Sequence, residues 1–402
     1  MNVLIVNAGS SSLKYQLFDT AAKSAMAKGV CERIGDKNGK IEHKVTGKEP
    51  YEVMTDMANH EEAIRNVIGL LVDGERGCIA SMDEIGAVGH RVVHGGPYFN
   101  SSVLATAEVL EKVELCRDLA PLHIGPSLVG IHACMDVMKD VPQVLVFDTA
   151  FHSTMPEEAY LYPIPYEYYE KYHVRRYGFH GSSHRYVSRE MIRILGKPAE
   201  ETKIVTCHLG NGSSIAAVKG GKVIDTTMGF TPLEGLIMGT RSGTIDPAII
   251  TFLMEKEGFT PAEMNAVLNK KSGLLGISGH SDFRDCCNAM VEKKDPRAAA
   301  AVKVLAYQVK KYIGSYAAAM GGLDAIVFTA GIGENNGMIR SAACQGLEYM
   351  GVAFDDEAND AVRRPITTTC ISKPDSKVKV YLIPTNEELV IAEDTEAVVS
   401  AL

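Results

Sequence analysis

The N-terminal segment VLIVNAGSSSLKYQLFD (residues 3–19) decides the fold class of this 402-residue chain. Its four opening apolar residues, 3–6, predict a buried strand, and residues 13–19 alternate apolar and polar side chains in the manner of a second strand. The polar stretch 7–12 between them has the composition of a tight turn. The segment therefore predicts that the chain opens with a β-hairpin.

The same pattern returns in the second half of the chain as IVTCHLGNGSSIAAV (residues 204–218). A strand-like run is again followed by a Gly/Ser turn and a second strand, and Gly220-Gly221 then leads into a third strand at 223–225. We interpret the repeat as an ancient duplication, which predicts two related lobes that each begin with a β-meander.

Elsewhere, strand-like apolar runs alternate with helical patterns, which is typical of α/β proteins. Helices are expected at 104–118, 123–139, 182–195 and 296–320, buried strands at 144–147 and 325–328, a capping box at 260–263 and a helix cap at 385–388. The segment 151–180 is rich in Pro and Tyr and is the best candidate for a junction between lobes. The predicted organisation is an N-terminal lobe at 1–150 and a C-terminal lobe at 151–385.

The composition excludes several classes of protein. Apolar residues make up 46% and charged residues 23%, as in ordinary globular proteins, and the net charge of −9 argues against nucleic-acid binding. Nine scattered cysteines without a C-x-x-C pair indicate reduced thiols. The N-terminus lacks the basic region of a signal peptide, and no apolar run is long enough to span a membrane. We therefore expect a cytoplasmic protein that binds neither nucleic acid nor membrane.

Three glycine-rich turns follow strands, at 9–12, 210–214 and 331–335. Such turns expose backbone N–H groups that suit phosphate oxygens, and the hydroxyls of Ser10, Ser12, Ser213 and Ser214 and the charge of Lys14 add to them. One turn alone would be explained by chain reversal, but three favour a phosphate site. The chain has no P-loop, and the glycines after 331 do not match the dinucleotide fingerprint, so nicotinamide-dinucleotide binding is not expected.

Arg91 and Arg241 each lie among glycines, where a guanidinium can give a bidentate grip on a carboxylate or phosphate. Asp148 ends a predicted buried strand, the place where α/β proteins build their sites. Oxygen ligands for Mg²⁺ are expected from Asn7, Asp148 and Glu387, although Glu387 could equally be a simple helix-capping residue.

Two histidine pairs, His90/His94 and His180/His184, have the i,i+4 spacing of some zinc sites. Neither pair contains the glutamate of the H-E-x-x-H motif, which disfavours a zinc hydrolase. Single histidines that donate to an anion are the better interpretation, in particular His123 and His180.

These features together resemble the signature motifs of the acetate kinase (acetokinase) family. In family order the motifs are NAGSSSLK (7–14), GHRVVHGG (89–96), FDTAFH (147–152), YGFHGSSH (177–184), HLGNGSS (208–214), GTRSG (239–243), TAGIGEN (329–335) and PTNEE (384–388). The resemblance implies the fold of the acetate and sugar kinase, heat-shock chaperone and actin superfamily: two duplicated ribonuclease-H-like (actin-like ATPase) lobes with a nucleotide cleft between them. It also implies that a C-terminal helix, 386–402, packs back on the first lobe, and that the protein is a homodimer.

The resemblance further implies a role for each matching residue. Catalytic roles fall to Arg91, Asp148, His180 and Arg241, and Mg²⁺ binding to Asn7 and Glu387. Substrate-binding residues are Arg91, which grips the carboxylate, together with Val93, Leu122, His123, Phe179 and Pro232. The nucleotide is expected to contact Lys14, His208, Leu209, Gly210, Asn211, Gly212, Asp282, Phe283, Arg284, Gly331, Ile332, Gly333, Glu334 and Asn335.

The implied function is that of an acetate kinase, with reversible, Mg²⁺-dependent, direct in-line phosphoryl transfer from ATP to acetate. Mn²⁺ is expected to substitute for Mg²⁺, and ATP and ADP are co-substrates. Two alternatives are a propionate or butyrate kinase with a larger pocket and, less favoured, an actin- or chaperone-like ATPase. Ser153 stands where the family has Gln and Thr244 where it has Asp or Asn, and both flank catalytic positions without occupying them.

Overall fold

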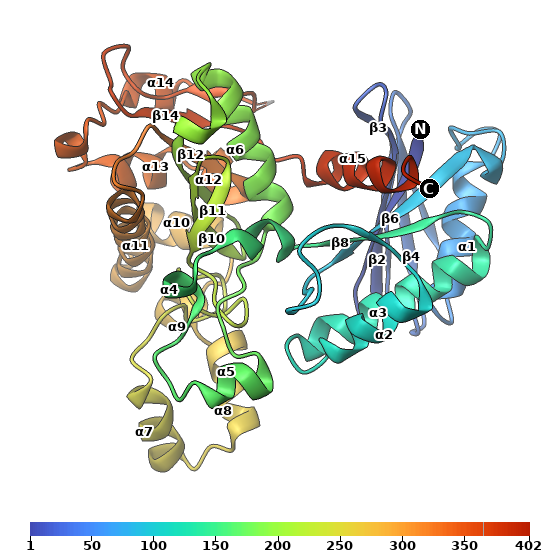
Figure 1. Cartoon of the computed structure of the whole chain (residues 1–402), viewed down its shortest axis with the longest axis horizontal. Coiled ribbons are helices and arrows are strands. Elements are labelled where there is room, and N and C mark those ends of the chain that lie inside the picture. The colour runs from blue at the N-terminus through green and yellow to red at the C-terminus, as the bar shows by residue number, and fades with distance from the viewer. Residues whose placement is uncertain (365) are drawn as a thin grey trace. The chain divides into compact units, whose positions relative to one another are not determined.

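The computed structural model describes residues 1–364 and 366–402 and divides into two compact units (Figure 1). Unit 1 consists of Met1–Phe151 and Asn386–Leu402, and unit 2 of His152–Thr385. Each unit contains one β-sheet with helices packed against it.

The sheet of unit 1 has eight strands in the order β5-β4-β3-β2-β1-β6-β8-β7. Their bounds are β1 Asn2–Ala8, β2 Ser12–Asp19, β3 Ser24–Glu32, β4 Lys40–Val45, β5 Tyr51–Met54, β6 Ile85–Val92, β7 Val103–Leu104 and β8 Gln143–Phe147. Strands β1 to β3 form the predicted antiparallel meander, β6 runs parallel to β1, and β8 runs parallel to β6. The alternating pattern of residues 13–19 places Leu13, Tyr15 and Leu17 in the core.

The sheet of unit 2 has six strands in the order β11-β10-β9-β12-β14-β13. Their bounds are β9 Lys203–Leu209, β10 Ser213–Lys219, β11 Lys222–Thr226, β12 Ala325–Thr329, β13 Thr369–Cys370 and β14 Lys379–Leu382. Here too an antiparallel meander, β9 to β11, is followed by β12 parallel to β9 and β14 parallel to β12. The common topology confirms the predicted duplication of a ribonuclease-H-like lobe.

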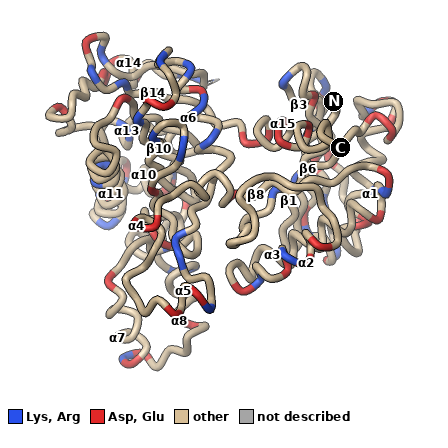
Figure 2. The backbone as a smooth tube through the Cα atoms, in the orientation of Figure 1, with Lys and Arg blue, Asp and Glu red and all other residues tan. Residues whose placement is uncertain are grey.

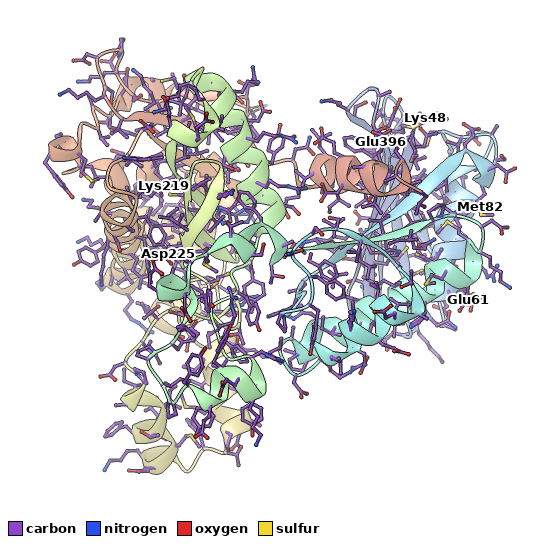
Figure 3. All side chains as sticks on the ribbon, in the orientation of Figure 1. Lys48, Glu61, Met82, Lys219, Asp225 and Glu396 are labelled. Atoms are coloured by element: carbon purple, nitrogen blue, oxygen red, sulfur yellow. The ribbon has the colours of Figure 1, made fainter. Side chains whose placement is uncertain are left out.

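Helices α1 and α3 pack together against the strands of unit 1, and α15 packs on β1, β6 and β8. The unit-1 helices are α1 His60–Leu71, η1 Met82–Glu84, α2 Ala107–Leu115, α3 Pro121–Val137 and α15 Glu387–Val399, and η2 Ala150–Thr154 spans the unit boundary. Gly89 of β6 makes the approach of α15 possible, because a Cβ there would lie 2.4 Å from Thr395 Oγ1. Glu396 of α15, labelled in Figure 3, accepts a hydrogen bond from Thr20 Oγ1 at 2.7 Å.

Most of the core of unit 2 lies between its sheet and the long helix α11. The helices of this unit are α4 Glu157–Tyr160, α5 Glu167–Tyr172, α6 Gly181–Leu195, η3 Ala199–Glu201, α7 Ala248–Glu257, α8 Pro261–Lys270, α9 Gly273–Ser278, α10 Phe283–Glu292, α11 Pro296–Met320, α12 Ala330–Asn335, α13 Gly337–Cys344, η4 Glu348–Met350 and α14 Asp356–Asp360. The predicted capping box at Thr260 and Glu263 is present at the start of α8.

The structure corrects three expectations. The segment 331–335 is not an open turn but part of the short helix α12, which begins at Ala330 with a positive φ of 65°. Only the first residues of 151–180 lie at the unit boundary, and the rest, including α4 and α5, belongs to unit 2. Helix α2 begins at Ala107 rather than 104, because the Thr106 side chain accepts the N–H of Val109 and caps the helix.

Lys and Arg residues are interspersed with Asp and Glu over both units (Figure 2). All nine cysteines are free thiols. Within the described part of the chain, no helix is both long and apolar enough to cross a membrane.

Candidate active site

In unit 1 the predicted catalytic residues Arg91 and Asp148 form one bidentate ion pair. Arg91 Nε donates to Asp148 Oδ1 at 3.0 Å and Nη2 donates to Oδ2 at 2.6 Å. Parallel strands β6 and β8 bring the two together, since Arg91 lies opposite Val146 and Asp148 follows the end of β8. Asp148 is only 2% exposed, and its charge raises the pKa of Arg91. One edge of the guanidinium is thus fixed on Asp148, and the edge carrying Nη1 is the one suited to a substrate carboxylate.

Glu387, the first residue of α15, joins this group: its Oε2 lies 3.9 Å from Arg91 Nε. Burial raises the pKa of Glu387, and Glu388 adds to the effect, whereas Arg91 opposes it. A carboxylate in such surroundings gains from a nearby cation. Asn7 and Lys14 are direct cross-strand partners on β1 and β2, so their side chains lie on the same face of the sheet.

The described residues contain no cluster of three or more His, Cys, Asp or Glu placed to hold a metal ion, so unit 1 has no closed metal cage. The oxygen donors of Asn7, Asp148 and Glu387 nevertheless fit Mg²⁺, which is usually held by one or two carboxylates together with waters and substrate phosphates. The partly buried carboxylate of Glu387, whose pKa is raised by burial, is the observation that supports this fit.

Three further predicted substrate residues lie in unit 1. Val93 follows the end of β6 and is half-buried, and His123 lies in the first turn of α3. Leu122, beside it, exposes 68% of its surface. The Leu122 side chain is therefore accessible to a ligand and is not part of the core.

In unit 2, His180 is the N-cap residue of helix α6 and has a left-handed conformation with φ 59°, which is uncommon for a residue other than glycine. Its Nδ1 lies 2.8 Å from Ser214 Oγ, and its ring stacks on His208 with the centroids 4.2 Å apart. Gly212 packs beside it: a Cβ on this glycine would lie 3.4 Å from His180 Nε2 and 3.7 Å from Arg241 Nη1. The fold therefore gathers His180, His208, Arg241 and the Gly/Ser turn around one point.

Arg241 differs from Arg91 in having no carboxylate partner among the described residues. Its Nη1 donates to the backbone oxygen of Pro232 at 3.0 Å, and burial lowers its pKa. A half-buried guanidinium without a counter-charge favours an anionic ligand. Pro232 is thereby fixed next to Arg241, and Phe179, which precedes His180, is 2% exposed.

A cavity of about 510 Å³ in unit 2 contains many of the predicted nucleotide-binding residues. The predicted residues that line it are Gly210, Asn211, Asp282, Phe283, Arg284, Gly331, Ile332 and Asn335. Its size is within the range of ordinary ligand sites. Because Asn211 lies at its wall, the cavity adjoins the group formed by Gly212, His180 and Arg241.

Five lining residues were not predicted: Gly239, Leu274, Ser281, Asn336 and Arg364. Gly239 lies in the GTRSG motif, and a Cβ there would come within 2.0 Å of Asn211 Oδ1, so the glycine allows this close approach. For Leu274 and Arg364 the sequence carries no local signal, because they reach the cavity only through folding.

Some predicted nucleotide residues are used differently. The Leu209 side chain lies in the core of unit 2, so only its backbone can serve a ligand. The Glu334 carboxylate accepts the N–H groups of Ala330 at 2.9 Å and Thr385 at 3.1 Å, and thus holds the two loops together rather than lining the cavity. His208, near the end of β9, has its Nδ1 2.7 Å from Ser183 Oγ. Lys14 belongs to unit 1 and is not part of this cavity.

Comparison with known proteins agrees with the motifs. The model of the acetokinase family matches residues 2–393. An acetate kinase of Caldanaerobacter subterraneus subsp. tengcongensis is 59% identical over the full length of both chains. The crystal structure of Porphyromonas gingivalis acetate kinase superposes with a TM-score of 0.95 at 47% identity, covering 99% of both chains. A propionate kinase of Francisella tularensis gives 0.91 at 40% identity, covering 98% of this chain and 99% of the other.

These findings confirm the predicted enzyme class, a phosphotransferase of the acetate kinase type. The match covers both units and every motif quoted above, including the glycine-flanked arginines and the Gly/Ser turns. The chain belongs to the acetokinase family.

Proposed function

We propose that the protein catalyses ATP + acetate ⇌ ADP + acetyl phosphate by direct in-line transfer. A carboxylate oxygen is the nucleophile and is already ionised near neutral pH, so no general base is required. The difficulty is the repulsion between an anionic nucleophile and a polyanionic phosphate. Catalysis is then chiefly a matter of placing positive charge and hydrogen-bond donors.

The observation that carries the proposal is the arrangement in unit 2 of a ligand-sized cavity beside a half-buried Arg241 that has no carboxylate partner in the described part of the chain. Adenosine would occupy the end of the cavity lined by residues 282–284 and by Gly331, Ile332 and Asn335, with the phosphates running past Asn211 toward Gly212. Arg241 and His180 would then contact the phosphoryl group in flight and stabilise its charge.

Unit 1 supplies the groups for the acceptor acid. Arg91, held by Asp148, would bind the acetate carboxylate, and Val93 and Leu122 would contact its methyl group. Asp148 fixes the orientation of the guanidinium and is not required to remove a proton.

We further propose Mg²⁺ as the metal, or Mn²⁺ in its place, held by Asn7 and Glu387. Such an ion would offset the negative charge of the phosphates. Glu387 would contribute a partly desolvated carboxylate to this site. Arg91 Nε, which lies 3.9 Å from Glu387 Oε2, places one positive charge next to that carboxylate.

Two finer features of the proposal are a homodimer and a reducing, cytoplasmic location. Helix α7 supports the first, because none of its residues is buried although it is largely apolar, and Ile249 and Phe252 are exposed by 42% and 56%. Nine free thiols support the second.

The test is to trap acyl phosphate with hydroxylamine, using ATP, Mg²⁺ and acetate, propionate or butyrate in parallel. We expect acetyl hydroxamate to form with the highest kcat/KM. A higher kcat/KM with propionate would make the protein a propionate kinase, and ATP hydrolysis without acyl phosphate would contradict carboxylate phosphorylation altogether.

A further inference from the structure

Behind His180 lies a chain of buried polar groups, none of which lines the cavity of unit 2. Ser214 Oγ lies 2.8 Å from His180 Nδ1 and also 2.8 Å from His184 Nε2. His184 Nδ1 in turn lies 2.7 Å from Thr206 Oγ1. Ser214, His184 and Thr206 are all fully buried. The hydroxyl of Ser214 is therefore shared between two imidazole rings.

The direction of these hydrogen bonds is set at the far end of the chain. Thr206 Oγ1 donates to the backbone oxygen of Ala216 at 3.5 Å, and a carbonyl oxygen can only accept. With the proton of Thr206 directed to this carbonyl, its oxygen accepts from His184 Nδ1–H at 2.7 Å. His184 is neutral, because burial and the neighbouring His152 and His208 hold its pKa well below the usual range, and its Nε2 is then an acceptor.

An acceptor at His184 Nε2 takes the hydroxyl proton of Ser214. The oxygen of Ser214 must then accept from His180, which requires a proton on His180 Nδ1. We propose that Thr206, His184 and Ser214 are positioning residues that hold His180 in its Nδ1–H form, so that the proton it gains and loses is the one on Nε2. Nε2 is the atom beside Gly212, on the side of Arg241 Nη1.

This arrangement deepens the role of His180, and its kinetic part rests on the proposed function. Neutral His180 offers a lone pair at Nε2 and cannot donate to a phosphoryl oxygen, whereas the imidazolium donates and brings a positive charge. The groups that face His180 and influence this proton are His208 stacked on its ring, His184 beyond Ser214, and Arg241 across Gly212. His180 would therefore stabilise the transferring group as a cation.

The direct test is the tautomer of His180 in the full-length protein carrying nitrogen-15-labelled histidine, with its signals assigned by comparison with a His180→Ala sample. Above the pH at which His180 loses its charge, we expect the wild type to show a protonated Nδ1 and an unprotonated Nε2. In Thr206→Val the acceptor for His184 Nδ1–H is gone. His184 can then carry its proton on Nε2 and donate it to Ser214, and the Ser214 hydroxyl can donate to His180 Nδ1. The proton of neutral His180 should therefore move wholly or partly to Nε2.

Thr202→Val is the matched control. Thr202 is as buried as Thr206, but its hydroxyl donates to the backbone oxygen of Ala199 at 2.6 Å and contacts no histidine. It should leave the tautomer of His180 as in the wild type. A proton on Nε2 of neutral His180 in the wild type, or an unchanged tautomer in Thr206→Val, would overturn the relay.

A kinetic arm uses Ser214→Ala, which removes the shared hydroxyl. We expect kcat to fall about 10- to 100-fold, as when a group that orients a functional histidine is lost, and Ser214→Thr to restore most of it because the hydroxyl returns. Equal kcat in wild type and Ser214→Ala would overturn the kinetic role. If the tautomer results hold but the wild type forms no acyl phosphate, the relay stands and the proposed function fails.

Discussion

The two units share one sheet topology but handle charge in opposite ways. In unit 1, Arg91 is clamped by the buried carboxylate of Asp148, with Glu387 nearby. In unit 2, Arg241 has no carboxylate partner among the described residues: its Nη1 donates to the backbone oxygen of Pro232 at 3.0 Å and lies 3.9 Å from Met238 Sδ. The duplicated fold thus holds one arginine that is paired with a carboxylate and one that, among the described residues, is not.

The difference teaches what each arginine can do. A guanidinium fixed by a carboxylate is oriented well but adds little net charge, which suits the binding of a monoanionic acid. A half-buried guanidinium without a counter-ion adds a full charge where charge develops, which suits a phosphoryl transition state. Five experiments test the two units, beginning with the largest expected effect.

Arg241→Ala should lower kcat by at least about two orders of magnitude, because it removes the positive charge nearest the transferring group. The KM for acetate should change much less than kcat. The measurement is steady-state kinetics with the hydroxamate assay, with circular dichroism to check folding. A kcat close to that of the wild type would end the assignment of Arg241 to the transition state.

Asp148→Asn should destabilise unit 1 by roughly 2–4 kcal/mol, because it leaves Arg91 without its counter-charge in a largely buried position. Urea unfolding at neutral pH measures the change. Glu108→Gln is the control, since Glu108 forms an exposed ion pair with Lys112 at 2.8 Å and its loss should be barely measurable. Equal effects of the two substitutions would refute a special role for the Arg91–Asp148 pair.

Both units should lose stability in mild acid through buried histidines. Burial lowers the pKa of His90 in unit 1 to about 4, and that of His184 in unit 2 well below its usual value. Both imidazoles are neutral in the folded protein and become charged on unfolding below about pH 6.5. Their contribution to the free energy of unfolding is therefore complete above that pH and decreases as the pH falls toward about 4. Urea midpoints at pH 7.5 and 5 should show the loss.

His90→Gln should reduce the acid sensitivity of unit 1 alone, because it removes one titrating group and leaves the His184 relay untouched. The expected change is a smaller difference between the urea midpoint at about pH 7.5 and the urea midpoint at about pH 5 than in the wild type. An unchanged pH dependence in this variant would mean that other groups govern acid unfolding.

Val93→Ala should have the smallest effect, a modest shift of kcat/KM toward propionate. An extra methylene in a pocket is worth only about 1–3 kcal/mol, so the ratio of propionate to acetate should rise several-fold rather than reverse completely. Competition between the two acids in the hydroxamate assay measures the ratio. The same ratio in wild type and variant would remove Val93 from the acyl pocket.

Several elements of this protein are predictable from local sequence patterns alone. The hairpin at 3–19, its repetition at 204–218 and the helix at 296–320 follow from apolar periodicity and turn composition, and the structure has each of them. The prediction of a turn at 331–335 is wrong, because the segment belongs to the short helix α12. A Gly-Ile-Gly sequence is compatible both with chain reversal and with the start of such a helix. A local pattern cannot separate these two uses of glycine.

The sequence by itself determined the duplicated α/β fold, the family and the types of residue that handle phosphate and carboxylate, because periodicity and motif spacing are local properties of the chain. Only the tertiary structure decided which of those residues meet. It paired Arg91 with Asp148, left Arg241 against a carbonyl oxygen, turned Glu334 away from the cavity and set Ser214 between two histidines. The physical reason is that hydrogen-bond partners and burial depend on strands and loops that are distant in sequence and become neighbours only on folding.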